Sequence, residues 1–322
     1  MYSRSRIANG LAALALGLGV AAATPSAASA QAKIRFAYLK TISLMPFIYA
    51  EKKGYFKAEG IDLEMIAVPG GPAVGAAIAS GSADIGYAAP TPIAIAYEQG
   101  QPFRFFMSLE YEKTPERLWG YMLASEKSGV KSLKDLKGKT IVVGVPGGLC
   151  ELAARDWLNK AGIAVDQVKF LNNPFPQMPA MLEVGTADAA CIADPFASAA
   201  INSKARAVTL ARGYLAEVPV RYRIEGLFGA DSWIVAHKKE IAVLKKIFLR
   251  ATEELQTDAA AVKQILADEY RFPPALADSL RLYRVTDVDP VASDYQPVLD
   301  KMFEYKMLSK PMKADDLIAK PN

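Results

Sequence analysis

Short apolar segments typical of buried strands alternate along the chain with segments whose apolar residues recur at helical spacing. In the first third of the chain the pattern predicts strands at 34–38, 61–67 and 84–87. Helices are predicted after them, from Pro46 to Lys53, over 73–79 and from Pro92. This β-α-β-α-β-α order predicts an α/β fold in which a parallel sheet is covered by helices on both faces.

The same pattern starts again in the middle of the chain. Two predicted strands, 103–109 and 119–124, bracket a charged loop, and further strands follow at 141–144, 168–171 and 189–193. A strand pair at Arg221–Gly226 and Trp233–Ala236 is expected to lead the chain back to the first unit. From Lys238 onward the pattern is helical, with later helices at 259–270, 275–282 and 295–306, and predicts packing for the first unit.

Landmarks of the first unit recur in the second at a nearly constant separation. Gly60 recurs as Gly162, Gly81 as Gly185, Asp84 as Asp188 and Pro90 as Pro195. We interpret this as one α/β unit present twice, which gives two lobes with a ligand cleft between them. Lobe one is predicted to comprise 31–118 plus 228–322 and lobe two 119–227, so two crossover segments form a hinge.

The first thirty residues have the pattern of a secretory signal peptide. Arg4 and Arg6 precede an apolar run over 11–23, and Ala28-Ser29-Ala30 is a small-residue cleavage site, with Ala30-Gln31-Ala32 as an alternative. We therefore expect residues 1–30 to be removed and the protein to reside in the periplasm. Loss of the two arginines lowers the formal net charge from +4 to +2. A chain this close to neutrality has no general attraction to nucleic acid.

Catalytic chemistry has little support in the sequence. His237 is the only histidine and stands at the start of a predicted surface helix. The sequence contains no Gly-x-Ser-x-Gly, no His/Cys metal cluster, no Gly-x-Gly-x-x-Gly after a strand and no P-loop. Asp84 and Asp188 begin equivalent strands and are expected to accept hydrogen bonds from loop amides. We therefore predict binding without turnover, with no catalytic residue, metal or cofactor.

The two cysteines, Cys150 and Cys191, leave two alternatives open. An exported pair can form a disulfide. A position in a turn for Cys150 and in a core strand for Cys191 is equally typical of two buried thiols.

Two identical Val-Pro-Gly-Gly turns are the strongest candidates for a ligand site. The first turn, 68–71, follows the second strand of lobe one, and the second turn, 145–148, follows the first strand of lobe two. Both lie at the carboxyl end of a strand, the edge at which open α/β sheets bind ligands. Glycines let the backbone approach a ligand closely, and free amides at helix starts attract anions. Tight turns alone would also explain the glycines.

Other polar and aromatic residues follow strands at the same edge. Hydroxyl groups can donate to a ligand oxygen, and aromatic rings can stack on a ligand ring. Taken singly, each residue also fits loop capping or core packing. The predicted ligand-binding residues are Thr41, Ser43, Gly70, Gly71, Thr91, Gly147, Gly148, Cys150, Asn173, Asp194, Phe196 and Trp233.

Four segments carry a family resemblance: 48–61 (IYAEKKGYFKAEGI), 79–86 (ASGSADIG), 129–141 (GVKSLKDLKGKTI) and Asp194-Pro195-Phe196. They resemble the periplasmic solute-binding proteins for aliphatic sulfonates, taurine and nitrate, whose superfamily includes binders of thiamine-pyrimidine precursors. The resemblance implies a periplasmic binding protein type II fold, with two Rossmann-like lobes joined by hinge crossovers. It also implies a monomer that delivers a small-molecule ligand to the membrane permease of an ABC importer.

The resemblance also points to the site. It implies ligand contacts from Thr41, Gly71, Thr91 and the turn from Gly147 to Cys150. Many relatives have a small hydroxyl residue in that turn, where this chain has Leu149 and Cys150. This departure argues against a sulfonate or other small oxyanion, but the sequence does not choose between such a sulfonate-like solute and a larger aromatic or heteroaromatic one.

Two other classes of protein share this fold. A pyrimidine synthase of the fungal type uses histidine and cysteine-rich iron chemistry, for which one histidine and two cysteines are too few. The effector lobes of a transcription regulator would follow a helix-turn-helix, and the predicted leader occupies that place. We therefore expect a solute-binding protein, with the enzyme as the alternative.

Overall fold

The computed structural model describes residues 31–113, 117–215, 218 and 220–320. The predicted signal peptide lies outside the described residues. Among the described helices, none has both the length and the apolar character needed to cross a membrane.

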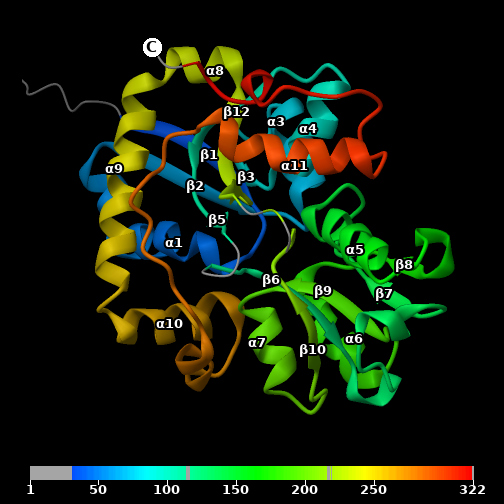
Figure 1. The fold of residues 1–322 in the computed structure, drawn as a ribbon. Coiled ribbons are helices and arrows are strands. Elements are labelled where there is room, and N and C mark those ends of the chain that lie inside the picture. Colours follow the sequence, from blue (N-terminus) through cyan, green and yellow to red (C-terminus); the bar gives the residue numbers. More distant parts are fainter. Residues whose placement is uncertain (1–30, 114–116, 216–217, 219, 321–322) are drawn as a thin grey trace, which may run out of the picture. The chain divides into compact units, whose positions relative to one another are not determined.

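The first five-stranded sheet has the order β2-β1-β3-β12-β4 (Figure 1). Its strands are β1 (Ala32–Tyr38), β2 (Ile61–Ala67), β3 (Ile85–Ala88), β4 (Phe103–Ser108) and β12 (Gly226–Ala230). β1 pairs in parallel with β2 and β3, whereas β12 runs antiparallel to both β3 and β4.

The second five-stranded sheet has the order β10-β6-β9-β7-β8. Its strands are β6 (Gly120–Ala124), β7 (Thr140–Val142), β8 (Lys169–Leu171), β9 (Ala189–Ala193) and β10 (Val208–Arg212). β7 pairs in parallel with β8 and β9, and β6 runs antiparallel to β9 and β10. Two separate sheets of this kind give the predicted α/β class; the exact lobe boundaries remain a prediction.

The strands predicted to form parallel sheets do pair in parallel, β1 with β2 and β3, and β7 with β8 and β9. β6 and β12, by which the chain enters one sheet from the other, each add one antiparallel inner strand. The predicted strand Trp233–Ala236 is wrong, because α8 (Asp231–Ala236) is a helix. Conversely, β10 was not predicted.

Helices pack against both sheets (Figure 1). Around the first sheet lie α1 (Met45–Lys52), α2 (Tyr55–Ala58), α3 (Gly71–Ala79), α4 (Pro90–Glu98), α8, α9 (Lys238–Leu255), α10 (Ala259–Tyr270) and α11 (Ala292–Glu304). Around the second lie α5 (Leu149–Lys160), α6 (Met178–Val184) and α7 (Phe196–Ile201). Helix α9 packs on α1 through the rings of Phe248 and Phe47, whose centroids are 5.2 Å apart.

The internal repeat has a clear structural counterpart. The Asp84 carboxylate accepts a hydrogen bond from the Arg35 amide at 2.8 Å, and the Asp188 carboxylate accepts one from the Thr140 amide at 2.8 Å. Each aspartate thereby ties the start of its own strand to a neighbouring strand. Both aspartates accept from backbone amides as predicted, but these amides belong to strands β1 and β7 and not to loops.

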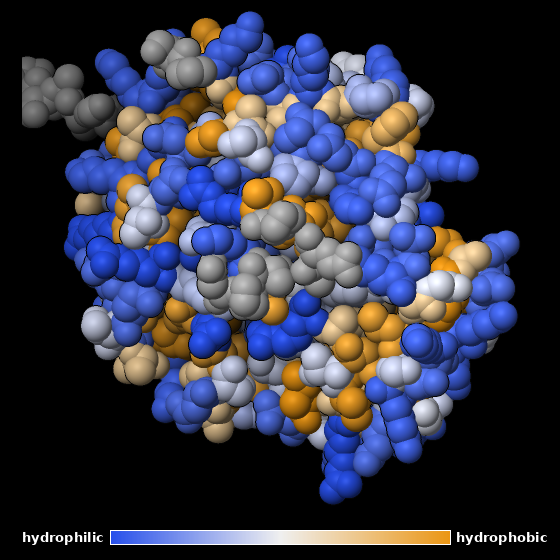
Figure 2. All heavy atoms as spheres, viewed as in Figure 1, coloured by the Kyte–Doolittle hydropathy of each residue, from blue (hydrophilic) through white to orange (hydrophobic). Residues whose placement is uncertain are grey.

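The chain crosses between the sheets through a two-stranded ribbon. It pairs β5 (Tyr111–Glu112) with β11 (Tyr222–Arg223). On the face viewed in Figure 2, hydrophilic residues predominate and the hydrophobic residues gather in several separate groups.

Candidate functional site

A cavity of about 60 Å³ lies where loops of the first sheet meet loops of the second. A buried water takes at least about 10–15 Å³ on this measure, so the space suits a solute of only a few heavy atoms. Its lining is mostly apolar. The first sheet contributes Leu39, Pro69, Gly70, Gly71, Ala89 and Pro92, and the second contributes Val143, Gly144, Val145, Gly148, Leu149, Cys150, Pro174 and Phe175. Tyr214 and Glu225, from the crossover region, complete it.

Three helices begin at this cavity. α3, α4 and α5 have Gly70, Ala89 and Gly148 as N-cap residues, and none of these caps makes a side-chain hydrogen bond. Each helix follows a strand, which places its first turn at the carboxyl edge of a sheet. The positive ends of three helix dipoles therefore face a common space.

However, few backbone N–H groups of these turns and helix starts are free to donate to a ligand. Proline, which has no N–H, occupies position 72 in α3 and positions 90 and 92 in α4. In the second turn the Gly147 amide donates to the Glu151 carboxylate at 2.8 Å, and the Gly148 amide donates to the Val145 carbonyl at 3.1 Å. The amides of this turn are thus used within the protein.

Among the lining residues that the structure describes, Glu225 is the one acidic residue, and none is Lys, Arg or His. Its Oε2 atom is buried and has no hydrogen-bond partner among the described residues. Burial raises the pKa of Glu225 to about 7, and the hydroxyls of Ser43, Tyr87 and Thr41 act in the opposite direction. This carboxyl group can therefore change its charge near neutral pH.

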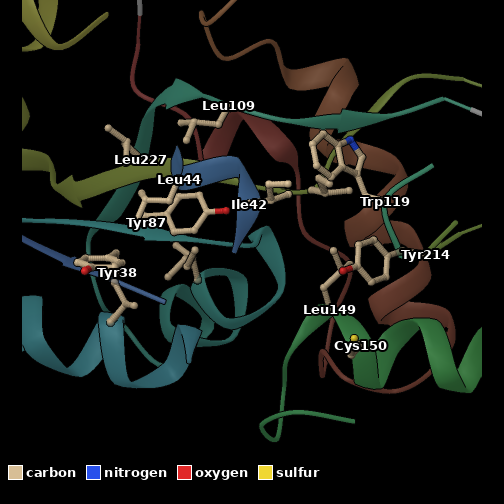
Figure 3. Close-up of a cluster of buried hydrophobic side chains, with 14 of the residues drawn as sticks. Tyr38, Ile42, Leu44, Tyr87, Leu109, Trp119, Leu149, Cys150, Tyr214 and Leu227 are labelled. Carbon is tan, nitrogen blue, oxygen red and sulfur yellow. The ribbon is translucent and has the colours of Figure 1, made fainter. Parts of the chain in front are cut away.

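A group of hydroxyls stands around this carboxyl group. The Thr41 and Tyr87 hydroxyl oxygens lie 2.5 Å apart, and the Tyr270 hydroxyl donates to the Thr41 carbonyl at 2.6 Å. In Figure 3 the phenol oxygens of Tyr87 and Tyr214 point inward from opposite sides of the view. These contacts hold Thr41 and Tyr87 in fixed positions beside Glu225.

The cysteines are both free and buried. Burial raises the pKa of the Cys191 thiol, and the neighbouring Cys150 thiol raises it further. Of the two alternatives for this pair, the structure has the two thiols, with Cys150 on the cavity wall. No group of three or more His, Cys, Asp or Glu side chains in the described part of the chain is arranged to hold a metal ion.

The structure brings most of the predicted site residues to this region. Gly70, Gly71, Gly148 and Cys150 line the cavity. Thr41 and Ser43 are buried beside Glu225. Thr91 lies in the first turn of α4, between lining residues 89 and 92, and its buried hydroxyl has no partner among the described residues. Gly147 lies next to Gly148, but its amide is occupied by Glu151.

Eight of the twelve predicted residues are outside the lining: Thr41, Ser43, Thr91 and Gly147, described above, and Asn173, Asp194, Phe196 and Trp233. The Asn173 amide group contacts the Met181 sulfur at 3.2 Å. The Asp194 carboxylate accepts hydrogen bonds from Ser198, at 2.7 Å from its hydroxyl. Phe196 packs its ring on Tyr270 and Phe272. Trp233 on α8 stacks on His237, the residue that follows this helix, with ring centroids 4.3 Å apart.

Sequence reasoning missed Glu225 and Tyr214, which bring a carboxyl group and a phenol hydroxyl to the described part of the lining. Both belong to segments near the crossovers, and no motif marks them. One signal was available for Glu225, which is an acidic residue directly before the apolar strand β12. Such a residue is either exposed to solvent at the end of the strand or buried in a functional site, and only the tertiary packing distinguishes the two cases.

Comparisons with known proteins agree with this geometry. The model of the family described as NMT1/THI5 like matches residues 41–261. A curated relative, the nitrate/nitrite binding protein NrtA of Nostoc sp. (strain PCC 7120 / SAG 25.82 / UTEX 2576), is 28% identical over 199 residues. The match covers 57% of this chain and 45% of that relative, so the chain matches less than half of the relative's length.

Solved structures show the same fold. The alkanesulfonate-binding protein SsuA from Xanthomonas axonopodis pv. citri, bound to MOPS, superposes with a TM-score of 0.75 at 22% identity, covering 90% of this chain and 99% of that one. The periplasmic nitrate-binding protein NrtA from Synechocystis PCC 6803 superposes with a TM-score of 0.72 at 14% identity, covering 89% of this chain and 86% of that one. The predicted two-lobe fold of periplasmic binding proteins is thereby confirmed, and the family match shows that this chain belongs to the NMT1/THI5-like family.

Proposed function

We propose that this protein is the solute-binding component of an ABC importer, acting as a monomer in the periplasm. It captures a small organic solute between its two lobes and delivers the solute unchanged to a membrane permease. The observation that carries this proposal is the cavity itself, whose wall is built jointly by strand-end loops of both sheets. A solute held there contacts both lobes and so favours the closed arrangement over an open one.

The relatives support this role. NrtA of Nostoc is named for nitrate and nitrite binding, and the SsuA structures for sulfonate binding. The solute of this chain is a separate question, because the identity to each of these proteins is below 30%.

A binding screen tests the proposal. The purified protein is titrated with small anions, amines, amides and aromatic acids, and thermal unfolding is recorded for each. A solute that binds the folded state raises the melting temperature as its concentration rises. Small-angle scattering with the best solute is expected to show a smaller radius of gyration than scattering without it, because the lobes close.

Recovery of the solute separates transport from catalysis. Mass spectrometry of the solute after prolonged incubation is expected to return it intact. Steady conversion of the solute by the purified protein would instead favour the enzyme alternative of the same fold. A protein that binds solutes of no class, or that binds without compaction, would contradict the proposed function.

A further inference from the structure

The chemistry of the cavity wall selects one class of solute. From the position of Glu225 and the absence of any basic side chain in the described lining, we infer that the solute carries a cationic or N–H-donating nitrogen group, such as an ammonium or amidinium, that pairs with this carboxylate. This inference rests on the proposed function and names the class of its ligand.

The first step is the unpartnered carboxylate oxygen. Oε2 of Glu225 is buried in the wall, and no group of the described residues donates to it. A buried acceptor without a partner costs free energy, and a buried carboxylate without a counter-charge costs more. A donor supplied by the solute removes that cost, which makes Glu225 a natural recognition group.

The second step concerns anions. An oxyanion needs donors, yet the Gly147 amide is taken by Glu151, and Glu151 also holds Arg155 through contacts of 2.6 and 3.1 Å. A second carboxylate therefore already stands at the positive end of α5, where a bound anion would otherwise be stabilised. In the lining itself, the ionised carboxyl group of Glu225 would repel a nitrate or sulfonate.

The third step concerns size and shape. The cavity of about 60 Å³ suits a compact solute, and most of its wall is apolar. A planar group of about four heavy atoms fits such a volume on the scale of one buried water per about 10–15 Å³. Acetamidinium, acetamide and acetate have this size and nearly the same shape, and they differ mainly in charge and donors.

Other titratable groups lie within electrostatic range of Glu225. Tyr87 on β3, Tyr270 on α10 and the lining residue Tyr214 are each influenced by it electrostatically. Glu110, on the crossover, also lies within its electrostatic range and pairs with Arg117. None of these groups supplies a free cation to the cavity.

The experiment is calorimetric titration of the purified protein with acetamidinium, acetamide, acetate, nitrate and ethanesulfonate. We expect acetamidinium to bind most tightly, and the Glu225→Gln variant to weaken it by about tenfold or more, as for the loss of a hydrogen bond to a charged group. Gln keeps the shape of the side chain and removes its charge. Glu64 is an exposed acid on β2 that takes no part in the proposed recognition of the solute. Glu64→Gln makes the same chemical change there and is expected to leave binding unaltered.

The pH profile is a second readout that a purely structural role of Glu225 would not give. Because a cation binds the ionised carboxyl group, the affinity for acetamidinium is expected to rise by about tenfold between pH 6 and pH 8 in the parent protein. About one proton should be released per solute at pH 6, and close to none at pH 8. Both effects should be absent from Glu225→Gln.

The outcomes divide cleanly. Tighter binding of acetate, nitrate or ethanesulfonate than of acetamidinium would overturn the inference and leave the proposed function standing. An acetamidinium affinity that Glu225→Gln does not reduce would also overturn it. If none of the five probes binds, the inference fails, and the broader screen decides the function separately.

Discussion

Glu112 is a buried carboxylate that organises the crossover next to the cavity. It accepts hydrogen bonds from the amides of Trp119 at 2.6 Å, Gly120 at 2.9 Å and Tyr214 at 2.6 Å, and from the Tyr222 hydroxyl. Burial raises the pKa of Glu112, and these donors act in the opposite direction. One side chain thus fixes both crossover segments and the cavity residue Tyr214.

Removing this acceptor is expected to destabilise the protein strongly. In Glu112→Ala the same three amides and the hydroxyl lose their partner, and unsatisfied buried donors cost about 1–3 kcal/mol each. We therefore expect the free energy of unfolding, measured with urea, to fall by about 3 kcal/mol or more. Glu126→Ala, which removes a largely exposed carboxylate, is the control and should change it by less than about 0.5 kcal/mol. Equal small changes in both variants would contradict this role.

Glu225 should also make stability depend on pH. Burial raises its pKa to about 7, so between the usual carboxyl value and 7 the folded protein holds a proton that the unfolded chain has released. Uptake of this proton stabilises the folded protein at low pH. As the pH rises through this window the stabilisation is lost, and the free energy of unfolding falls by up to about 3 kcal/mol. The difference in unfolding free energy between Glu225→Gln and the parent protein, both without solute, should therefore grow from pH 5 to pH 8. A difference that is flat over this range would contradict the burial of an ionisable group at this position.

The two Pro-Gly-Gly turns form contacts between elements of different lobes. A β-carbon on Gly70 would lie 2.8 Å from Val145 Cγ1, and one on Gly147 would lie 2.8 Å from Ile95 Cδ1. The glycines thus allow each turn to approach the opposite lobe. The sequence predicted these turns as ligand contacts, and the structure adds that they also form the surface on which the lobes meet.

A side chain at Gly70 is expected to hold the lobes apart. Gly70 has a φ of 177°, an extended conformation open to any residue, so Gly70→Ala introduces no backbone strain. Overpacking against Val145 costs about 1–3 kcal/mol in the closed form, so solute affinity should fall about fivefold or more. Calorimetry measures the affinity, and small-angle scattering measures the loss of compaction.

Gly75→Ala in the same helix is the matched control. A β-carbon there would lie 3.8 Å from Phe103, an ordinary contact, and alanine favours the helix by about 0.5–1 kcal/mol. We expect unchanged affinity and equal or higher stability. If Gly70→Ala behaved like this control, the turns would not be the surface on which the lobes close.

Local pattern predicted most elements because each strand is a short apolar run bounded by turns. The limits of β2 and β9 were predicted without error. Strand direction was not predictable, because nothing in the residues of β6 or β12 encodes that they enter a sheet in reverse. The segment Trp233–Ala236 has the β-branched and aromatic composition of a strand, but it follows Asp231 at the start of a helix.

The site was predicted where chain geometry determines it and missed where packing does. Gly70 and Gly148 end up in the cavity wall because turns after parallel strands share one edge of a sheet. Glu225 lies on an antiparallel return segment, which that rule does not cover. Phe196 was expected to stack on a solute, yet the ring packs on Tyr270 because α7 contacts the end of α10.

Contacts remote from the cavity also join the two lobes of the molecule. The Tyr305 hydroxyl, just after α11, donates to the Asp156 carboxylate on α5 at 2.9 Å, and Asp156 is only 1% exposed. At another point the Ile42 amide donates to the Asp194 carbonyl at 3.2 Å. In the open arrangement of the proposed function these contacts would be broken, so they would contribute to the closing equilibrium without touching the solute.

Loss of the contact between α5 and α11 should therefore weaken solute binding from a distance. Tyr305→Phe removes one hydrogen bond to a carboxylate, worth about 1.5–3 kcal/mol, from the closed form alone. Because apparent affinity scales with the population of the closed form, we expect it to fall about tenfold while the pH profile set by Glu225 keeps its shape. Tyr55→Phe makes the same chemical change where the hydroxyl donates to Glu254 within one lobe. That variant should lose stability but keep its affinity. If Tyr55→Phe and Tyr305→Phe lowered affinity equally, the loss would reflect general stability and not lobe closure. That result would contradict the proposal that the two lobes close around the solute.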